Sequence, residues 1–343
     1  METWKFVGGS LGLSVSSQTS GMYSISVHVK NGAILTSYFT SATSQLGLPS
    51  SIRLDRGLLE ILATKPDWLP ETLFHQLHVS RHGFNMNSTF EDFEYLLKGN
   101  PADASPIIRS FDAEMRVLES QFSTSWLPGD YVFFLGCRMM LYSIALTTVS
   151  DALEESSSVS NTVESPCHWV VQAYLTAIST IRAVVSIRDS IFYTPARMQK
   201  LLMNSICYLA LLRCSRFQEL VDSATLSNAI HQGWEILRGL SVTSNDFISR
   251  ASRICERVGR YSEGLKPEQR TKGLLVLKSR MGANIAFSTA IRAREWSRQL
   301  QDDSTPTEMN TSEQPTDDFS IDDLSLFADI NWDDILYLGP GAP

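Results

Sequence analysis

Apolar residues recur every three or four positions through most of this chain, and that spacing limits the fold more than any other feature. Between Arg53 and Thr64 the apolar side chains fall at the positions of one helix face. Comparable patterns, many opened by a proline or a capping residue, predict further helices. They cover about 70–80, 88–97, 106–122, 128–146, 169–188, 194–212, 217–240, 245–261 and 267–298. Strands do not alternate with these segments, so we predict an all-α fold of about nine or ten helices.

Three segments of different composition define the expected domains. Residues 1–32 are rich in Ser and Gly and predict an irregular N-terminal segment, with one weak strand pattern at 23–29. Residues 33–300 carry the helical pattern, interrupted by a serine-rich connector at 151–165. Residues 301–343 are rich in Asp, Ser, Thr and Pro, a composition that predicts a disordered acidic tail.

The remaining composition indicates a soluble intracellular chain. The most apolar run, 131–146, includes Gly136 and Arg138 and is shorter than a membrane span, so we expect a buried core helix and no membrane contact. The N-terminus has no sustained apolar stretch of the signal-peptide kind. Five widely spaced cysteines without a C-x-x-C pair predict reduced, buried thiols.

Charge is divided unevenly along the chain. The 29 basic and 37 acidic residues give a formal charge of −8. Residues 302–343 hold eleven acids and no Lys or Arg, so the rest has 29 basic and 26 acidic residues, a charge of +3. A nearly neutral body argues against an electrostatic clamp on nucleic acid, which requires clustered positive charge.

The acidic tail carries the sharpest functional pattern. From residue 317 onward, carboxylates alternate with large apolar and aromatic side chains, as in amphipathic activation segments. The acids keep the apolar groups in water until a partner offers a groove, where they form one helical stripe. The alternative is a terminal helix that docks on its own core. The predicted partner-binding residues are Ile321, Leu324, Phe327, Ile330, Trp332, Ile335 and Leu336.

Several strings, taken together with this tail, resemble the C-terminal regulatory region of fungal zinc-cluster transcription factors. The likeness covers about residues 33–338 and rests on the strings at 46–49, 52–55, 84–87, 90–97, 126, 131–138, 141–143 and 332–334. It implies an all-helical regulatory domain and control of transcription in the nucleus, often of a metabolic gene cluster. That family binds DNA through six cysteines that share two zinc ions, and no such spacing occurs here.

Two polar stripes are candidate binding sites. Glu71, His75, His78 and His82 are spaced along one predicted helix face and are either a metal site or, as we prefer, a polar surface. Arg250, Arg253, Arg257 and Arg260 form a second stripe, opposite Ile254, Cys255 and Val258. That stripe is either a solvated face or a surface for an acidic partner, including the tail itself.

An enzyme of the terpene-cyclase type is a remote alternative. The string 245–249 begins like that family's N-D-x-x-S-x-x-x-E metal motif, but Arg253 stands where the final Glu is required. The acids at 91–94 match an aspartate-rich motif only loosely. We therefore predict no catalytic, cofactor-binding or metal-binding residues.

The combined prediction is a nuclear transcription regulator that recruits coactivators or transcription machinery through its tail. It would enter the nucleus from the cytoplasm and reach DNA indirectly or through a module outside this sequence. A homodimer, or a heterodimer with a zinc-cluster factor, is expected. The alternative is an interaction protein that sequesters such a factor.

Overall fold

The computed structural model describes residues 56–91, 104–155, 167–194, 196–243, 246–276 and 284–302. Within these ranges the chain is all-α, with nine α-helices and no strands, as predicted. The helices are α2 Arg56–Thr64, α3 Glu71–Glu91, α5 Ser105–Phe122, α6 Pro128–Glu155, α7 Cys167–Ser186, α8 Ala196–Cys214, α9 Ser223–Leu240, α10 Phe247–Gly264 and α11 Asn284–Asp302. Short 3₁₀ turns η2 Ile191–Tyr193, η3 Arg216–Leu220 and η4 Pro267–Gln269 connect some of them.

Side-chain caps start two of these helices. The Asp222 carboxylate accepts a hydrogen bond from the Thr225 amide at 2.7 Å and opens α9. The Asp246 carboxylate accepts from the Ser249 amide at 2.6 Å and opens α10. Each aspartate satisfies an amide that lacks an intrahelical partner, which is why short polar residues precede these helices.

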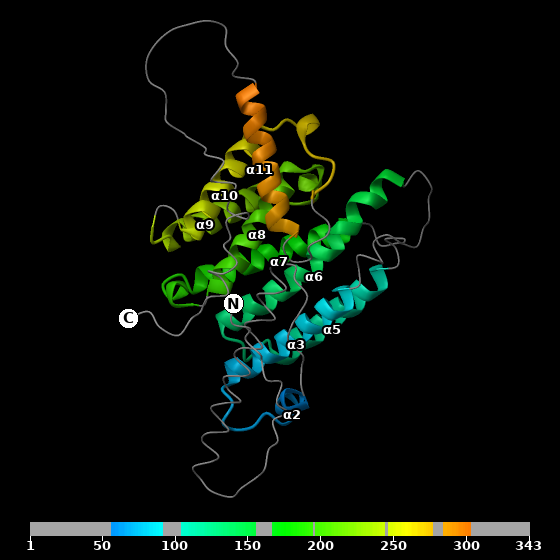
Figure 1. Cartoon of the computed structure of the whole chain (residues 1–343), viewed down its shortest axis with the longest axis vertical. Helices are drawn as coiled ribbons and strands as arrows, with labels where there is room; N and C mark the ends of the chain where they lie inside the picture. The colour runs from blue at the N-terminus through cyan, green and yellow to red at the C-terminus, as the bar shows by residue number, and fades with distance from the viewer. Residues whose placement is uncertain are drawn as a thin grey trace, which may run out of the picture.

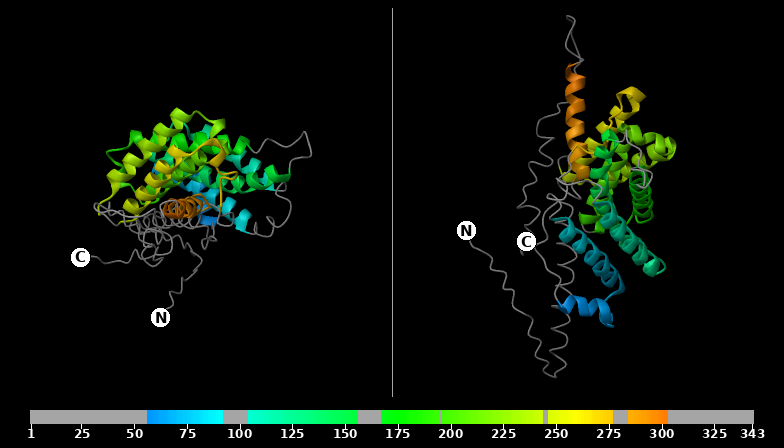
Figure 2. Two further views of the ribbon diagram at one scale, coloured as in Figure 1. Left: turned by 90° about the horizontal axis from the view of Figure 1, so that it is seen from above. Right: turned by 90° about the vertical axis from the view of Figure 1, so that its right-hand side faces the viewer.

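Helix α8 lies at the centre of the molecule. It packs against α6, α7, α9, α10 and α11, and every residue from 201 to 212 is buried. A helix that is apolar on all sides is stable only in such an interior position. Figure 1 shows α3 and α5 beside α6 toward one end of the molecule, with α2 beyond them. Figure 2 shows α11 along the opposite part, where it contacts α8 and α10.

The apolar run at 131–146 is buried, as predicted. Two described helical windows, Pro128–Thr147 and Cys167–Ser186, are long and apolar enough to cross a membrane by length and composition alone. The protein itself buries 83% of the first window and 56% of the second, as expected for helices that form a core. The expectation that the first run is too short to span a bilayer was wrong, because its apolar window covers 20 residues.

All five cysteines are free, and four of them are buried. Burial alone raises the pKa of the Cys137 thiol to about 12, so it stays protonated. The sulfurs of Cys207 and Cys255 lie 4.0 Å apart between α8 and α10. The prediction of reduced, mostly buried thiols is consistent with this arrangement; Cys167 is the partly exposed member.

Three predicted helix boundaries were wrong. The segment expected to start a new helix at Ser88 continues α3, because Val79, Met86 and Phe90 extend one buried face. The single helix expected from 217 to 240 is η3 followed by α9. Helix α6 also runs into the predicted connector as far as Glu155.

The helix expected over 267–298 is interrupted before α11 begins at Asn284. The Thr271 amide donates to the Cys214 carbonyl at 2.9 Å, and the Thr271 carbonyl accepts from the Arg216 amide at 3.1 Å. These bonds join the loop to the end of α8, so both backbone groups are unavailable to a helix. The predicted N-terminal segment 1–32 and the strand within it lie outside the described residues.

Candidate functional site

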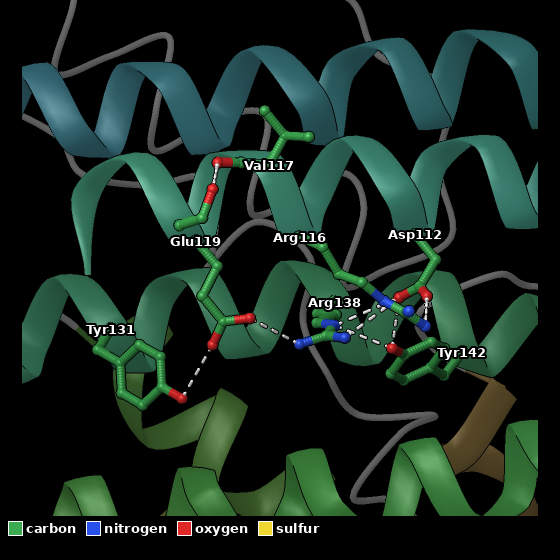
Figure 3. Close-up of polar contacts among 8 residues, drawn as sticks. Asp112, Arg116, Val117, Glu119, Tyr131, Arg138 and Tyr142 are labelled. Atoms are coloured by element: carbon green, nitrogen blue, oxygen red, sulfur yellow. Dashed lines mark hydrogen bonds and ion pairs between the residues drawn. The ribbon is translucent and has the colours of Figure 1, made fainter.

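A buried polar network joins α5 to α6 (Figure 3). Asp112 of α5 is 2% exposed, and its Oδ1 accepts a hydrogen bond from the Tyr142 hydroxyl of α6 at 2.6 Å. The Arg138 Nε donates to that same hydroxyl oxygen at 2.9 Å, and its Nη2 lies 3.4 Å from Asp112 Oδ1. Burial raises the pKa of Tyr142 well above its ordinary value, so its hydroxyl keeps the proton that it donates.

The same network extends to Glu119, two helix turns further toward the end of α5. Arg138 Nη1 donates to Glu119 Oε2 at 3.0 Å, and the Tyr131 hydroxyl donates to Glu119 Oε1 at 3.3 Å. Arg138 therefore links two carboxylates, one in the core and one near the surface. Charged side chains that are buried away from water require oppositely charged or hydrogen-bonding partners of this kind.

Glu119 and Tyr131 also line a pocket of about 580 Å³ between the end of α5, the start of α6 and the last turns of α7. The other lining residues are Ser123, Trp126, Pro128, Ser179, Arg182, Ala183 and Ser186. The Trp126 ring packs 5.6 Å from Tyr131 and 4.6 Å from Phe134, measured between ring centroids. The pocket thus combines an aromatic wall with polar side chains from three helices, the usual character of a small-molecule site.

A second, more polar hollow of about 400 Å³ lies where α9 ends and α10 begins. Its lining includes Arg238 of α9 and Arg253 of α10, together with Glu256 and four hydroxyl side chains: Ser241, Thr243, Ser249 and Ser252. Of the predicted arginine stripe, Arg250 and Arg253 are half-buried, and the side chains of Arg257 and Arg260 lie outside the described part. Ile254, Cys255 and Val258 are buried opposite, as the spacing indicated.

The histidines of α3 do not form the polar surface that we preferred. His75 is only 1% exposed, and His82 Nδ1 lies 3.3 Å from Glu114 Oε2. His78 stacks edge-on to Phe74 at 4.5 Å, and burial, followed by its cationic neighbours, lowers its pKa to about 4. The surface interpretation was wrong because α5 and α6 cover this face of α3.

The metal alternative gains no support either. Across the described ranges, His, Cys, Asp and Glu side chains nowhere gather in a group of three that could hold an ion. Three imidazoles spread over two helix turns point to different neighbours instead of one centre.

Ser125, His75 and Asp130 have the hydroxyl–imidazole–carboxylate order of a nucleophilic triad. Ser125 Oγ lies 3.2 Å from His75 Nε2, and His75 Nδ1 lies 3.5 Å from Asp130 Oδ2. Asp130 Oδ1 accepts from Gln76 Nε2 at 3.0 Å, and Gln76 Oε1 accepts from Arg197 Nη2 at 2.7 Å. Because this chain of contacts joins α3, α6 and α8 around the buried His75 and Asp130, we interpret it as a cross-link between helices.

The terpene-cyclase motif has another role where it is described. Asp246 caps α10 and also accepts from the Val242 and Thr243 amides at 2.7 and 3.1 Å. Partial burial raises the pKa of this carboxyl, but the three amide hydrogen bonds lower it more, so the pKa lies below its ordinary value. Its lone pairs are directed at the backbone. Asn245 and residues 92–94 of the looser motif lie outside the described residues.

The predicted tail residues from Ile321 to Leu336 lie outside the described residues, so the structure brings none of them to a site. Sequence reasoning missed the pocket and the buried network beside it, although one signal for the network was present. Arg138 interrupts the most apolar run of the chain, and a charge at such a position requires a buried partner. That partner, Asp112, could not be assigned, because it lies 26 residues earlier on another helix.

Comparison of the chain with protein-family models, with curated proteins and with solved structures finds no match in any of the three. The class that the described residues define is therefore an all-α helical protein with a large core and a mixed aromatic and polar pocket.

Proposed function

We propose that this chain regulates transcription in the nucleus, with a helical body that receives signals and an acidic tail that recruits coactivators. The observation that carries the proposal is the alternation of carboxylates with Phe, Trp, Ile and Leu after residue 317. The all-α body is compatible with the resemblance to the regulatory region of fungal zinc-cluster factors. Recruitment by apolar residues needs no catalytic group, so we propose no enzymatic activity.

The proposed activity of the tail depends on apolar side chains that are exposed in the free chain and buried when a partner binds. Eleven carboxylates repel one another and oppose self-association of the apolar side chains between them. A partner with an apolar groove buries the exposed apolar face of the tail. A basic rim around that groove reduces the repulsion among the carboxylates. Affinity then rests mainly on the aromatic and aliphatic anchors.

A reporter assay tests this proposal directly. Residues 302–343 fused to a neutral DNA-binding domain are expected to activate a reporter, and changing Phe327, Trp332 and Leu336 to Ala should abolish most of that output. The matched control changes Thr305, Thr307 and Thr311 to Ala, which leaves charge and apolar anchors intact. Equal output from both triple variants would refute the proposal.

One feature of the sequence favours a second function, sequestration of a related factor. The five cysteines do not supply a C-x-x-C pair or six zinc ligands, so DNA contact depends on a partner or on a module outside this sequence. If the body pairs with a zinc-cluster factor without recruiting coactivators, co-expression should lower that factor's reporter output. Recruitment predicts that the output rises.

A further inference from the structure

The pocket between α5, α6 and α7 has dimensions suited to a small organic molecule. Its volume of about 580 Å³ falls inside the range of roughly 300–1,000 Å³ that is typical of such sites. Pro128 and Ala183 contribute apolar surface beside the two aromatic rings. All of the residues that define it belong to the described part of the chain.

The wall formed by Trp126 and Tyr131 selects for flat ligands. The planes of the two rings meet at 35°, and Phe134 supports Trp126 from behind at 4.6 Å between centroids. Both lining rings are half-buried, so each keeps some surface exposed. Aromatic rings prefer offset or edge contacts with another π system, and a planar unsaturated ligand provides them.

The pocket has one cationic side chain, Arg182. Arg182 is exposed on α7 and forms no ion pair with any described residue. A guanidinium that is exposed and unpaired by another protein side chain can bind an anionic ligand.

The pocket's one carboxylate is already engaged. Glu119 accepts from Arg138 through Oε2 and from Tyr131 through Oε1, so both oxygens have partners inside the protein. Glu119 is therefore less available to bind a cation, whereas the Arg182 guanidinium is available to bind an anion. The available groups favour an acceptor-rich, negatively charged ligand.

We propose that this pocket binds a small planar aromatic carboxylate. The aromatic part lies against Trp126 and Tyr131, and the carboxylate pairs with Arg182. This inference does not rest on the proposed regulatory function, because it concerns binding to the purified chain. Within a regulator, the site would receive the signal molecule.

Isothermal titration of the full-length chain with 2-naphthoate tests the proposal. We expect saturable binding with one site per chain. The neutral 2-naphthamide and the non-aromatic cyclohexanecarboxylate should each bind about tenfold more weakly or worse, because each lacks one of the two recognised features. A 2-naphthamide affinity equal to that of 2-naphthoate would overturn the assignment of an anionic ligand.

Variants connect binding to this pocket. Arg182→Met should weaken 2-naphthoate binding by about tenfold or more while leaving 2-naphthamide unchanged, since only the charge-assisted pair is lost. Trp126→Leu removes the ring from the aromatic wall, and it should weaken both ligands by a few fold. Arg294→Met, an exposed arginine of α11, serves as the control and should bind as the parent does.

Thermal melting of each variant without ligand confirms that the fold is retained, which is expected for exposed Arg182. Absence of saturable binding by the parent chain, or an Arg182→Met variant that binds 2-naphthoate as tightly as the parent, would refute the site. The reporter assay on the isolated tail stays informative in either case, because it does not involve this pocket.

Discussion

Asp112, Arg138 and Tyr142 show how single side chains decide the stability of the α5–α6 contact. Asp112 is nearly inaccessible to water, and its Oδ1 accepts from the Tyr142 hydroxyl at 2.6 Å. The Arg138 guanidinium lies 3.4 Å from the Asp112 carboxylate and balances its charge. The Arg138 Nε also donates a hydrogen bond to the Tyr142 hydroxyl oxygen. Because each group satisfies another, removal of one leaves a buried polar atom without a partner.

Truncation of this network should destabilise the protein in a graded way. Tyr142→Phe deletes one donor and one acceptor without changing the ring, and we expect a loss of about 1–3 kcal/mol in the free energy of unfolding. Asp112→Ala leaves the Arg138 charge half compensated and should cost about 3–5 kcal/mol. Urea denaturation followed by circular dichroism measures both.

Arg116 provides the matched control for these two variants. It pairs with Asp112 from the neighbouring helix turn, but its side chain is 55% exposed. An exposed ion pair contributes less than about 1 kcal/mol, so Arg116→Ala should stay close to the parent. If all three variants lost the same stability, the network would not be the cause.

His78 should make stability depend on pH below neutrality. Its pKa is about 4 in the folded chain and near 6.5 when unfolded, mainly because burial disfavours the charged ring. Between these values the unfolded chain binds a proton that the folded chain does not, so stability is full above pH 6.5 and falls as the pH decreases toward 4. From pH 7 to pH 5 the loss due to His78 is about 1 kcal/mol, because solvent around the partly exposed ring screens part of the effect.

The prediction is checked by comparing unfolding curves at pH 7 and pH 5 for His78→Gln and for the parent chain. Gln does not titrate, so the variant should lose about 1 kcal/mol less than the parent over this interval. His231→Gln is the control, because His231 is exposed on α9, where it lies near Glu235 and the Trp234 ring. Parallel pH profiles for all three chains would exclude His78 as the source.

At the scale of elements, the close approach of α6 to α8 depends on one missing side chain. A Cβ at Gly136 would overlap the Leu201 side chain, and Leu201 is buried in α8 at 4% exposure. Gly136→Ala should therefore cost about 1–3 kcal/mol through overpacking, more than the gain of up to about 1 kcal/mol in helix propensity. The midpoint of thermal unfolding reports the difference.

Gly259 of α10 is the control position, because a Gly→Ala change there alters helix propensity without altering packing. An added Cβ there meets no atom within 4 Å, so Gly259→Ala should stabilise the chain by about 0.5–1 kcal/mol. Opposite signs for the two Gly→Ala changes are expected. A stabilising Gly136→Ala would mean that Leu201 moves aside at little cost.

The helices that could be predicted are those whose apolar face and end signals are set by residues close together in the sequence. Residues 106–122 and 196–214 form helices close to the predicted limits, because proline openings and helical spacing are properties of neighbouring residues. The loop at 271 could not be predicted, since its hydrogen bonds go to Cys214 and Arg216 far away in the chain. The pocket was hidden for the same reason: Trp126 and Arg182 belong to segments that meet only in the folded structure.

At the scale of the whole molecule, the division of charge links the body to the tail. The body carries +3 and residues 302–343 carry −11, and the hollow at the α9–α10 junction places Arg238 and Arg253 together on the body. Glu256 offsets part of that charge, so an interaction with the tail would be weak and sensitive to salt. Weak masking of this kind would be readily reversed by a coactivator.

Hydrogen exchange of the full-length chain tests this masking. We expect amides at 241–253 to exchange severalfold faster in 1 M salt than at low salt, because the screening length falls to about 3 Å. The double variant Arg238→Glu and Arg253→Glu should exchange fast at both salt concentrations. Arg294→Glu, which changes charge on exposed α11, should behave as the parent. Ending the chain at residue 302 should reproduce the fast exchange of the double variant at low salt, and unchanged protection after that truncation would show that the tail does not cover this surface.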